Sequence, residues 1–182
     1  NKGSIQIDGL DIREYRLEYL RSKITTVLQD TFLFSDSIAN NITLNNPQIT
    51  REQLIATAKE VGAHDFIERL PGGYDYNVME RGATLSIGQA QLISFIRALV
   101  YDPKILVLDE ATSSIDTETE ELIQNVLHKL TQKRTSIIIA HRLSTIQNAD
   151  KIIVLDHGEI KEIGSHQELL KLNKYYKRLY DL

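Results

Sequence analysis

The stretch Ile105-Leu106-Val107-Leu108-Asp109-Glu110 decides the fold of this chain, because an apolar run ends abruptly in two carboxylates. A strand that is buried on both faces of a parallel sheet reads as a continuous run of Val, Ile and Leu. Residues that follow such a strand lie at the open edge of the sheet, where α/β folds bind their ligands. The stretch therefore predicts a parallel sheet with a ligand site at the end of strand 105–109.

Strand and helix patterns alternate along the rest of the chain. The predicted strands are 24–28, 105–109, 135–140 and 151–155, with a short one near Ile160. Helices are predicted from about Asp116, near Thr145, and after the capping box Ser165-x-x-Glu168. This alternation is typical of a parallel sheet that is covered by helices and joined by right-handed crossovers.

The stretch 31–101 shows helical patterns and no strand, so we predict an inserted helical subdomain there. Its expected helices are a short one capped by Ser35 or Asp36, one from the capping box Thr50-x-x-Gln53 to about Val61, and one from Ser86-x-x-Gln89 to about Val100. Gly62 and the pair Asp102-Pro103 are expected to end the second and third of these helices.

Composition excludes several classes of function. The chain has no cysteine, which removes disulfides and thiolate metal sites and fits a reducing, cytosolic setting. The net charge is −4 and Lys and Arg are scattered singly, so a nucleic-acid partner is not expected. The longest apolar runs are far shorter than the roughly 20 residues of a membrane span.

Asp109 and Glu110 have two interpretations. They can be solvated carboxylates at a strand end, one of them capping the next helix. Alternatively, Asp109 holds Mg²⁺, directly or through water, and Glu110 polarises an attacking water. The buried strand that precedes them favours the second interpretation.

Two more polar residues follow apolar runs. His141 comes after Ile137–Ala140, and Gln29 comes after the strand predicted at 24–28. His141 can be a satisfied structural residue, or it can hydrogen-bond a γ-phosphate and hold the attacking water. Gln29 can cap its strand or coordinate Mg²⁺ through its amide oxygen. Three polar strand ends at one sheet edge favour a shared site.

Ser86-Ile87-Gly88-Gln89 opens a helix. The free N–H groups at a helix start attract anions, and Gly88 lets another group approach the backbone closely. The alternative is an ordinary capped helix start, and this motif does not decide between the two by itself.

Taken in chain order, these motifs resemble the ATP-binding-cassette (ABC) ATPases over essentially the whole chain. The resemblance implies a P-loop NTPase (RecA-like) α/β fold, with its parallel-sheet core in 1–30 and 102–182 and the signature motif in the helical subdomain 31–101. It also implies ATP and Mg²⁺ as cofactors.

The resemblance assigns a role to each motif. Gln29 corresponds to the Q-loop glutamine at the Mg-nucleotide, and Leu85–Gln89 to the signature loop, in which Ser86, Gly88 and Gln89 contact nucleotide. Leu106–Glu110 corresponds to Walker B, with Asp109 at Mg²⁺ and Glu110 as catalytic base. Asp116 corresponds to the D-loop aspartate, and His141 to the catalytic histidine of the H-loop.

Within the family the chain is most similar to exporters. Glu80-Arg81-Gly82 resembles the exporter X-loop, and Leu28–Phe34 resembles the Q-loop surface that receives the coupling helices of transmembrane domains. The resemblance therefore implies the C-terminal, larger part of the ATPase domain of a bacterial ABC exporter, at the cytoplasmic face of the inner membrane. The exported substrate is not encoded in these residues.

The chain also departs from the family pattern. The phosphate-cradling GxxxxGK[ST] of Walker A is absent from these 182 residues. In the family's strand order, the Walker A strand lies between the strand ending at His141 and strand 152–155, so these two strands are predicted not to pair directly. Ile87 replaces the first glycine of the usual LSGGQ, and Ala90 replaces the arginine that usually follows it.

In the family, two such domains close head to tail, and the signature of one caps ATP held by the other. Intact Glu110 and His141 beside an altered signature resemble one subunit of a heterodimeric exporter; the alternative is a homodimer that tolerates Ile87. Two competing hypotheses for the chain are an isolated fragment or half-site without catalysis of its own, and a soluble cassette ATPase of repair or translation.

Overall fold

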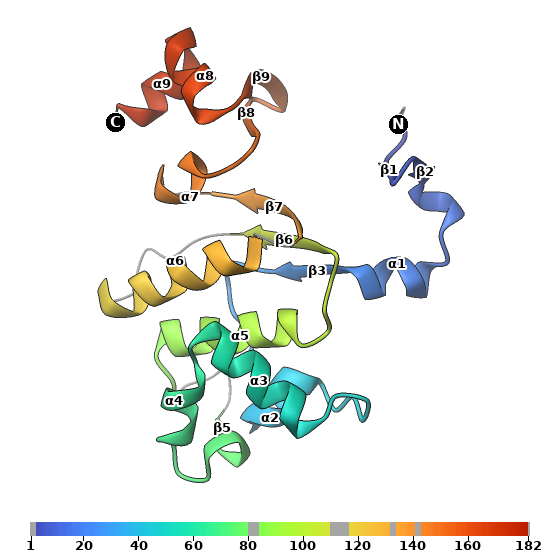
Figure 1. Ribbon diagram of the computed structural model, residues 1–182, viewed down its shortest axis with the longest axis vertical. Helices are drawn as coiled ribbons and strands as arrows, with labels where there is room; N and C mark the ends of the chain where they lie inside the picture. The colour runs from blue at the N-terminus through green and yellow to red at the C-terminus, as the bar shows by residue number, and fades with distance from the viewer. Residues whose placement is uncertain (1–2, 80–83, 110–116, 132–133, 141–142, 182) are drawn as a thin grey trace. The chain divides into compact units, whose positions relative to one another are not determined.

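We describe the protein from a computed structural model, which covers residues 3–79, 84–109, 117–131, 134–140 and 143–181 (Figure 1). The chain divides into two compact units, Asn1–Ile138 and Ile139–Leu182, which are treated separately below. No described helix has both the length and the apolar character that a membrane crossing needs.

A three-stranded sheet organises the first unit. Its strands lie in the order β3 (Ile24–Val27), β6 (Ile105–Asp109) and β7 (Thr135–Ile139). β3 and β6 are parallel, with Ile24 opposite Ile105 and Val27 opposite Leu108. The backbone N–H of Thr135 donates to the carbonyl of Lys104 (3.2 Å), so β7 and β6 begin at the same edge. The predicted parallel sheet is thereby confirmed.

Helices α5 (Ile87–Leu99) and α6 (Thr117–Thr131) supply much of the core of this unit. α5 packs against β3 and α6, and α2 (Ile38–Thr43) and α3 (Arg51–Val61) pack against α5 (Figure 1). α6 turns one apolar face to this core, on which Ile123, Val126, Leu127 and Leu130 are buried and Leu122 is half-buried. α5 is therefore the central element between the sheet and the smaller helices.

Capping residues define the ends of these helices as predicted. Thr50 and Gln53 form a reciprocal capping box at the start of α3, and Gly62 ends it with a φ of +74°. A left-handed residue at this position favours glycine, which has no Cβ. Two details differ from prediction: the N-cap of α2 is Ser37 rather than Ser35 or Asp36, and the short helix α4 (His64–Glu68) follows α3.

The prediction that 31–101 contains no strand was wrong. β4 (Asp36–Ser37) and β5 (Asn77–Val78) form a short antiparallel pair, and a 3₁₀ turn η2 (Gly73–Asp75) directly precedes β5. Strands of two residues are too short to show an alternating pattern, and Asp, Ser and Asn are uncommon in strands. Sequence periodicity could not reveal them.

The first unit begins with a hairpin of β1 (Gln6–Ile7) and β2 (Leu10–Asp11), joined by Asp8-Gly9. Both turn residues have positive φ, which is the conformation that an Asp-Gly hairpin turn requires. A 3₁₀ turn η1 (Ile12–Glu14) and helix α1 (Leu17–Lys23) then lead into β3.

The second unit contains α7 (Leu143–Gln147), the antiparallel hairpin β8 (Ile152–Asp156) and β9 (Glu159–Gly164), then α8 (His166–Leu172) and α9 (Tyr175–Tyr180). Its small core consists of Ile152, Val154, Leu169 and Tyr176. The predicted capping box of Ser165 and Glu168 begins α8. α9 was not predicted; buried Glu162 accepts hydrogen bonds from the backbone N–H groups of Tyr175 and Tyr176 at its start.

The apolar runs that were predicted as strands 24–28 and 135–140 are less buried than their composition suggests. In β3 only Val27 is buried, and in β7 the side chains of Ile137 and Ile139 are 56% and 53% exposed. A continuous apolar run does not reveal which faces of a strand are covered. β7 pairs in the sheet of β6, and β8 pairs with β9.

Candidate nucleotide-binding site

The sheet brings Gln29 and Asp109 to one edge. Val27 lies opposite Leu108 in the parallel register, so Asp109 is the next residue of β6 and Gln29 follows two residues after Val27. Gln29 is exposed and Asp109 is half-buried. Because β7 runs in the same direction as β6, Ala140 also leaves the sheet at this edge. The predicted convergence of strand ends is present in the backbone topology.

Three predicted site residues, Glu110, Asp116 and His141, lie outside the described residues. Glu110 directly follows Asp109, and His141 directly follows Ala140. Their assignment therefore rests on the sequence and on the strands that lead to them.

The start of α5 is a second group of predicted site residues. Ser86 is the N-cap; its Oγ accepts from the backbone N–H of Gln89 (3.2 Å), and the Oε1 of Gln89 accepts from the backbone N–H of Ser86 (3.0 Å). Gly88 is buried, whereas the side chain of Ile87 is 62% exposed. The helix start is thus built as predicted, and it presents an apolar side chain where the family has glycine.

These two groups are not joined by any hydrogen bond or ion pair among the residues that the structure describes. Gln29 and Asp109 share the sheet edge, and Ser86 and Gln89 share the helix start.

A metal at the sheet edge needs ligands beyond the described side chains. In the described part of the chain, no group of three or more His, Asp or Glu side chains could hold an ion. Mg²⁺ is commonly bound by one or two protein oxygens, with waters and phosphate oxygens completing its shell. The carboxylate of Asp109 and the amide oxygen of Gln29 fit that smaller requirement.

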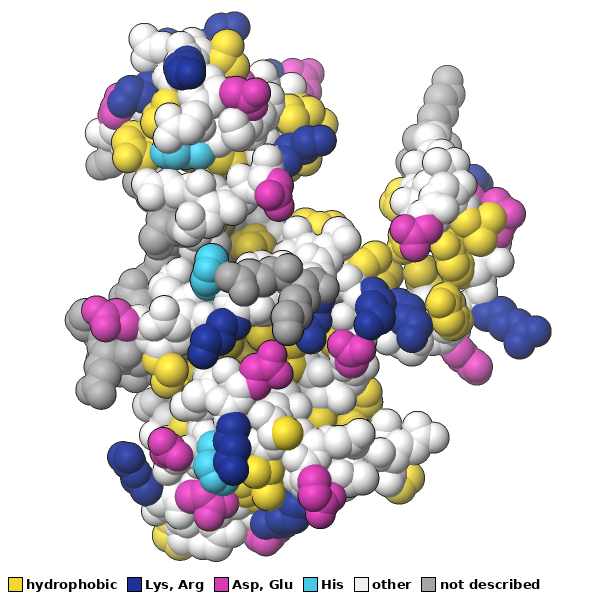
Figure 2. Space-filling view, in the orientation of Figure 1, with side chains coloured by type: hydrophobic (Ala, Val, Ile, Leu, Met, Phe, Trp, Pro, Cys, Tyr) yellow, Lys and Arg dark blue, Asp and Glu magenta, His cyan; other side chains and the backbone are white. Residues whose placement is uncertain are grey.

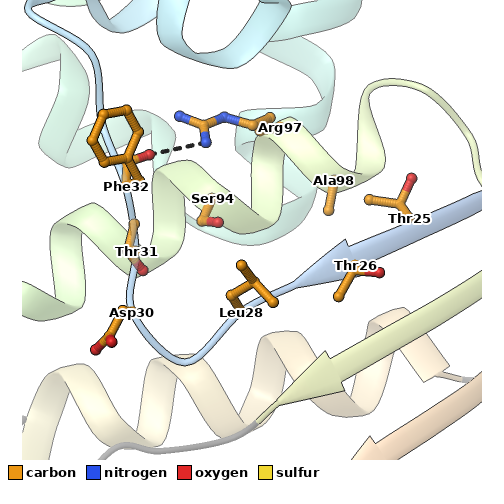
Figure 3. A pocket seen from close by; sticks show the side chains of 9 residues that line it. All are labelled: Thr25, Thr26, Leu28, Asp30, Thr31, Phe32, Ser94, Arg97 and Ala98. Carbon is orange, nitrogen blue, oxygen red and sulfur yellow. Dashed lines mark hydrogen bonds between the residues drawn. The ribbon is translucent and has the colours of Figure 1, made fainter.

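The segment after β3 combines exposed apolar side chains with a small cavity. Leu28, Phe32 and Phe34 are 62%, 55% and 50% exposed, and the two phenyl rings pack edge to face with centroids 4.9 Å apart. Beneath them, a cavity of about 130 Å³ lies between this segment and α5, and the side chains of Asp30 and Ser94 contribute to its lining (Figure 3). Exposed apolar side chains of this kind are typical of a docking surface.

Arg97 was not singled out by the sequence analysis. Its guanidinium also lines this cavity and donates to the carbonyl of Phe32 (3.0 Å), the contact drawn in Figure 3. Burial lowers the pKa of the Arg97 guanidinium from its usual value. The signal that could have found it is a single arginine within the apolar sequence of α5.

On the face shown in Figure 2, Lys and Arg (dark blue) are interspersed with Asp and Glu (magenta), and the described residues form no broad basic patch there.

Comparison with known proteins identifies the family. Residues 1–113 match the family described as ABC transporter. The chain belongs to the ABC transporter family. It has the P-loop NTPase fold of that family, and a solved bacterial Atm1-family ABC exporter with ATP bound superposes with a TM-score of 0.89 at 43% identity, covering 99% of this chain and 32% of that one.

Curated ABC transporters give the same result along the whole chain. The probable multidrug resistance ABC transporter ATP-binding/permease protein YheH of Bacillus subtilis (strain 168) is 50% identical over 181 residues, which is 100% of this chain and 27% of the relative. The ATP-dependent lipid A-core flippase of Haemophilus influenzae (strain 86-028NP) is 50% identical over 182 residues, again 100% of this chain and 31% of the relative. The chain therefore spans under a third of the length of these transporters.

Proposed function

We propose that this chain is the ATP-binding and ATP-hydrolysing domain of an ABC exporter, coupling ATP hydrolysis to the export of a substrate across a membrane. The observation that carries the proposal is the parallel register of β3 and β6, because it places Gln29 and Asp109 at one sheet edge. The exporter class is supported by a relative that is 50% identical to this chain and is named as a multidrug resistance ATP-binding/permease protein.

Each residue of the proposed site has its own role. Asp109 and Gln29 hold Mg²⁺, which when bound neutralises phosphate charge. Glu110 accepts a proton from the attacking water, and His141 orients that water and the terminal phosphate. Ser86, Gly88, Gln89 and Asp116 contact the nucleotide held by a partner domain.

The proposed partners are a second ABC nucleotide-binding domain and the transmembrane domains. The exposed apolar segment Leu28–Phe34, together with the X-loop residues 80–82, receives the coupling helices. In this arrangement the sheet core comprises 1–30 and 102–182, the helical subdomain comprises 31–101, and the domain lies at the cytoplasmic face of the inner membrane.

The partner domain is proposed to be a different chain. The exposed Ile87 at the signature weakens the site that this chain caps, because a β-branched residue does not reproduce the backbone freedom of glycine. The site that this chain builds at Asp109 and Glu110 keeps its acidic residues. In the proposed dimer, one nucleotide site therefore hydrolyses ATP, whereas the other only binds it.

Nucleotide binding by the full-length protein tests the proposed function. We expect Asp109→Asn to weaken the affinity for MgATP at least tenfold and to reduce its dependence on Mg²⁺. Asp156→Asn is the matched control, because Asp156 also ends a strand, β8, and is also half-buried. Equal affinities for the wild type and Asp109→Asn, or an equal loss in both variants, would refute the assignment.

The heterodimer proposal has its own test. Purified full-length subunit alone should hydrolyse ATP slowly, and addition of a second exporter half with an unaltered LSGGQ should raise the rate at least tenfold. Full ATPase activity of the isolated subunit would instead establish a homodimer that tolerates Ile87.

A further inference from the structure

Arg97 binds backbone carbonyls instead of a carboxylate. Its Nε donates to the carbonyl of Asn41 (2.7 Å) and its Nη1 to the carbonyl of Phe32 (3.0 Å). Within the described residues, no carboxylate lies within ion-pairing distance of the guanidinium. These charge-assisted hydrogen bonds tie two chain segments to the half-buried guanidinium, and through it to α5.

Asn41 completes the attachment from the other side. Its side chain is fully buried; Oδ1 accepts from the backbone N–H of Phe34 (2.7 Å), and Nδ2 donates to the carbonyl of Phe34 (2.9 Å). Arg97 also reaches the Oδ1 of Asn41 through Nη2 (3.4 Å). Together the two side chains hold the carbonyls of Phe32 and Phe34 and the amide of Phe34.

The backbone and the side chains of this segment therefore have separate environments. The phenyl rings of Phe32 and Phe34 are about half exposed, whereas their backbone groups are bound by Arg97 and Asn41. Figure 3 shows the bond between Arg97 and the carbonyl of Phe32. The side chain of Asn41 is fully buried and that of Arg97 is half-buried, so both lie between the segment and the helices below it. Such an arrangement suits a segment that is contacted from outside and must not move independently of the helix below.

We propose that Arg97 and Asn41 are positioning residues that fasten the backbone of Phe32–Phe34 to helix α5, so that displacement of this segment moves Ser86 at the other end of the helix. The distance from Ser86 to Arg97 along α5 is about 16 Å at 1.5 Å per residue. Because α5 is buried along Leu92, Ile93 and Ile96, it moves as a rigid element. The inference rests on the proposed function, in which the exposed segment meets a transmembrane domain and Ser86 meets nucleotide.

Arg134 provides a matched control. It is also an arginine that donates to two backbone carbonyls, those of Pro103 (3.2 Å) and Leu130 (3.3 Å). These contacts join the end of α6 to the start of β6 and do not involve the Phe32–Phe34 segment. Loss of Arg134 therefore removes two carbonyl contacts of the same kind, together with an ion pair to Asp102 (3.6 Å), without breaking the proposed link.

Amide hydrogen exchange of the full-length protein, with and without MgATP, tests the link. The Glu110→Gln background prevents turnover. In this background, MgATP should slow exchange in peptides covering 86–92 and 32–36. With Arg97→Met added, exchange in 32–36 should become at least tenfold faster and lose its response to MgATP, whereas the response in 86–92 should persist. Arg134→Met should keep both responses.

Several outcomes would overturn the proposal. These are an unchanged MgATP response in 32–36 with Arg97→Met, or an equal loss of response with Arg134→Met. If Arg97→Met does not fold, Arg97→Lys replaces it in the experiment, because one ammonium cannot reach both carbonyls in the same geometry. Arg97→Lys should make amide exchange in 32–36 at least threefold faster. If the wild type does not bind MgATP, the proposed function fails, and the exchange rates without nucleotide still test the attachment.

Discussion

Replacing Asn41 with alanine should cost far more stability than its size suggests. The fully buried side chain of Asn41 accepts from the N–H of Phe34 (2.7 Å) and donates to the carbonyls of Phe34 (2.9 Å) and Ser37 (3.1 Å). Removing one partner of a buried hydrogen bond leaves the other unsatisfied, at a cost of about 1–3 kcal/mol. The carbonyl of Phe34 and the guanidinium of Arg97 lose contacts as well, so we expect a loss of about 3 kcal/mol in the free energy of unfolding.

Equilibrium urea unfolding of the 182-residue chain measures this loss. The chain has eight tyrosines and no tryptophan, so tyrosine fluorescence and far-ultraviolet circular dichroism are suitable signals. With an m-value of about 2 kcal/mol/M, the midpoint of Asn41→Ala should fall by about 1.5 M.

The adjacent Asn40 is the control, because the same substitution on the same helix removes only a part-buried bond to Asp36 (2.8 Å). Asn40→Ala should cost no more than about 1 kcal/mol. A cost below about 1 kcal/mol for Asn41→Ala, or equal costs for the two variants, would refute the reasoning.

Three further predictions concern other parts of the chain. In the full-length protein, Glu110→Gln should bind ATP normally but hydrolyse it about 10²–10⁴ times more slowly, as measured by phosphate release, since it removes a positioned base; near-normal turnover would exclude that role. Gly62→Ala should destabilise the chain by more than about 1 kcal/mol in urea unfolding, because φ is +74° and the added Cβ would lie 3.0 Å from Cδ1 of Leu122. Burial raises the pKa of Tyr74 to about 12, whereas tyrosine in the unfolded chain ionises near pH 10. The free energy of unfolding should therefore fall as the pH rises from about 10 to 12. Tyr74→Phe should make that fall smaller and remove the last step of the absorbance titration at 295 nm.

The elements that sequence predicted well are those whose ends are encoded locally. α3, α5 and α8 each begin at a capping box of side chains three residues apart, and such a signal depends on no distant contact. A parallel sheet was predicted from apolar runs separated by helices, because that order leaves few topologies. Gln29 and Asp109 could be placed at one edge for the same reason.

The missed features depend on contacts between distant segments. β4 and β5 are two residues each, and their pairing joins positions about 40 apart in the sequence. The exposure of Ile137 and Ile139 depends on what covers β7, which an apolar run does not report. α9 begins where Glu162 binds two backbone N–H groups, so its N-terminal partner lies thirteen residues upstream in β9.

Arg97 shows why a positioning residue is harder to recognise than a catalytic one. A Mg²⁺ site or a general base requires particular side chains, and such residue types stand out at strand ends. The partners of Arg97 are the carbonyls of Phe32 and Asn41, which any residue supplies, so the partner positions leave no mark in the sequence. Only Arg97 and Asn41 themselves are informative, as a half-buried arginine among the apolar residues of α5 and a buried asparagine in α2. A polar side chain within a buried helix therefore indicates that backbone from another segment is held there, and the structure is needed to identify which segment.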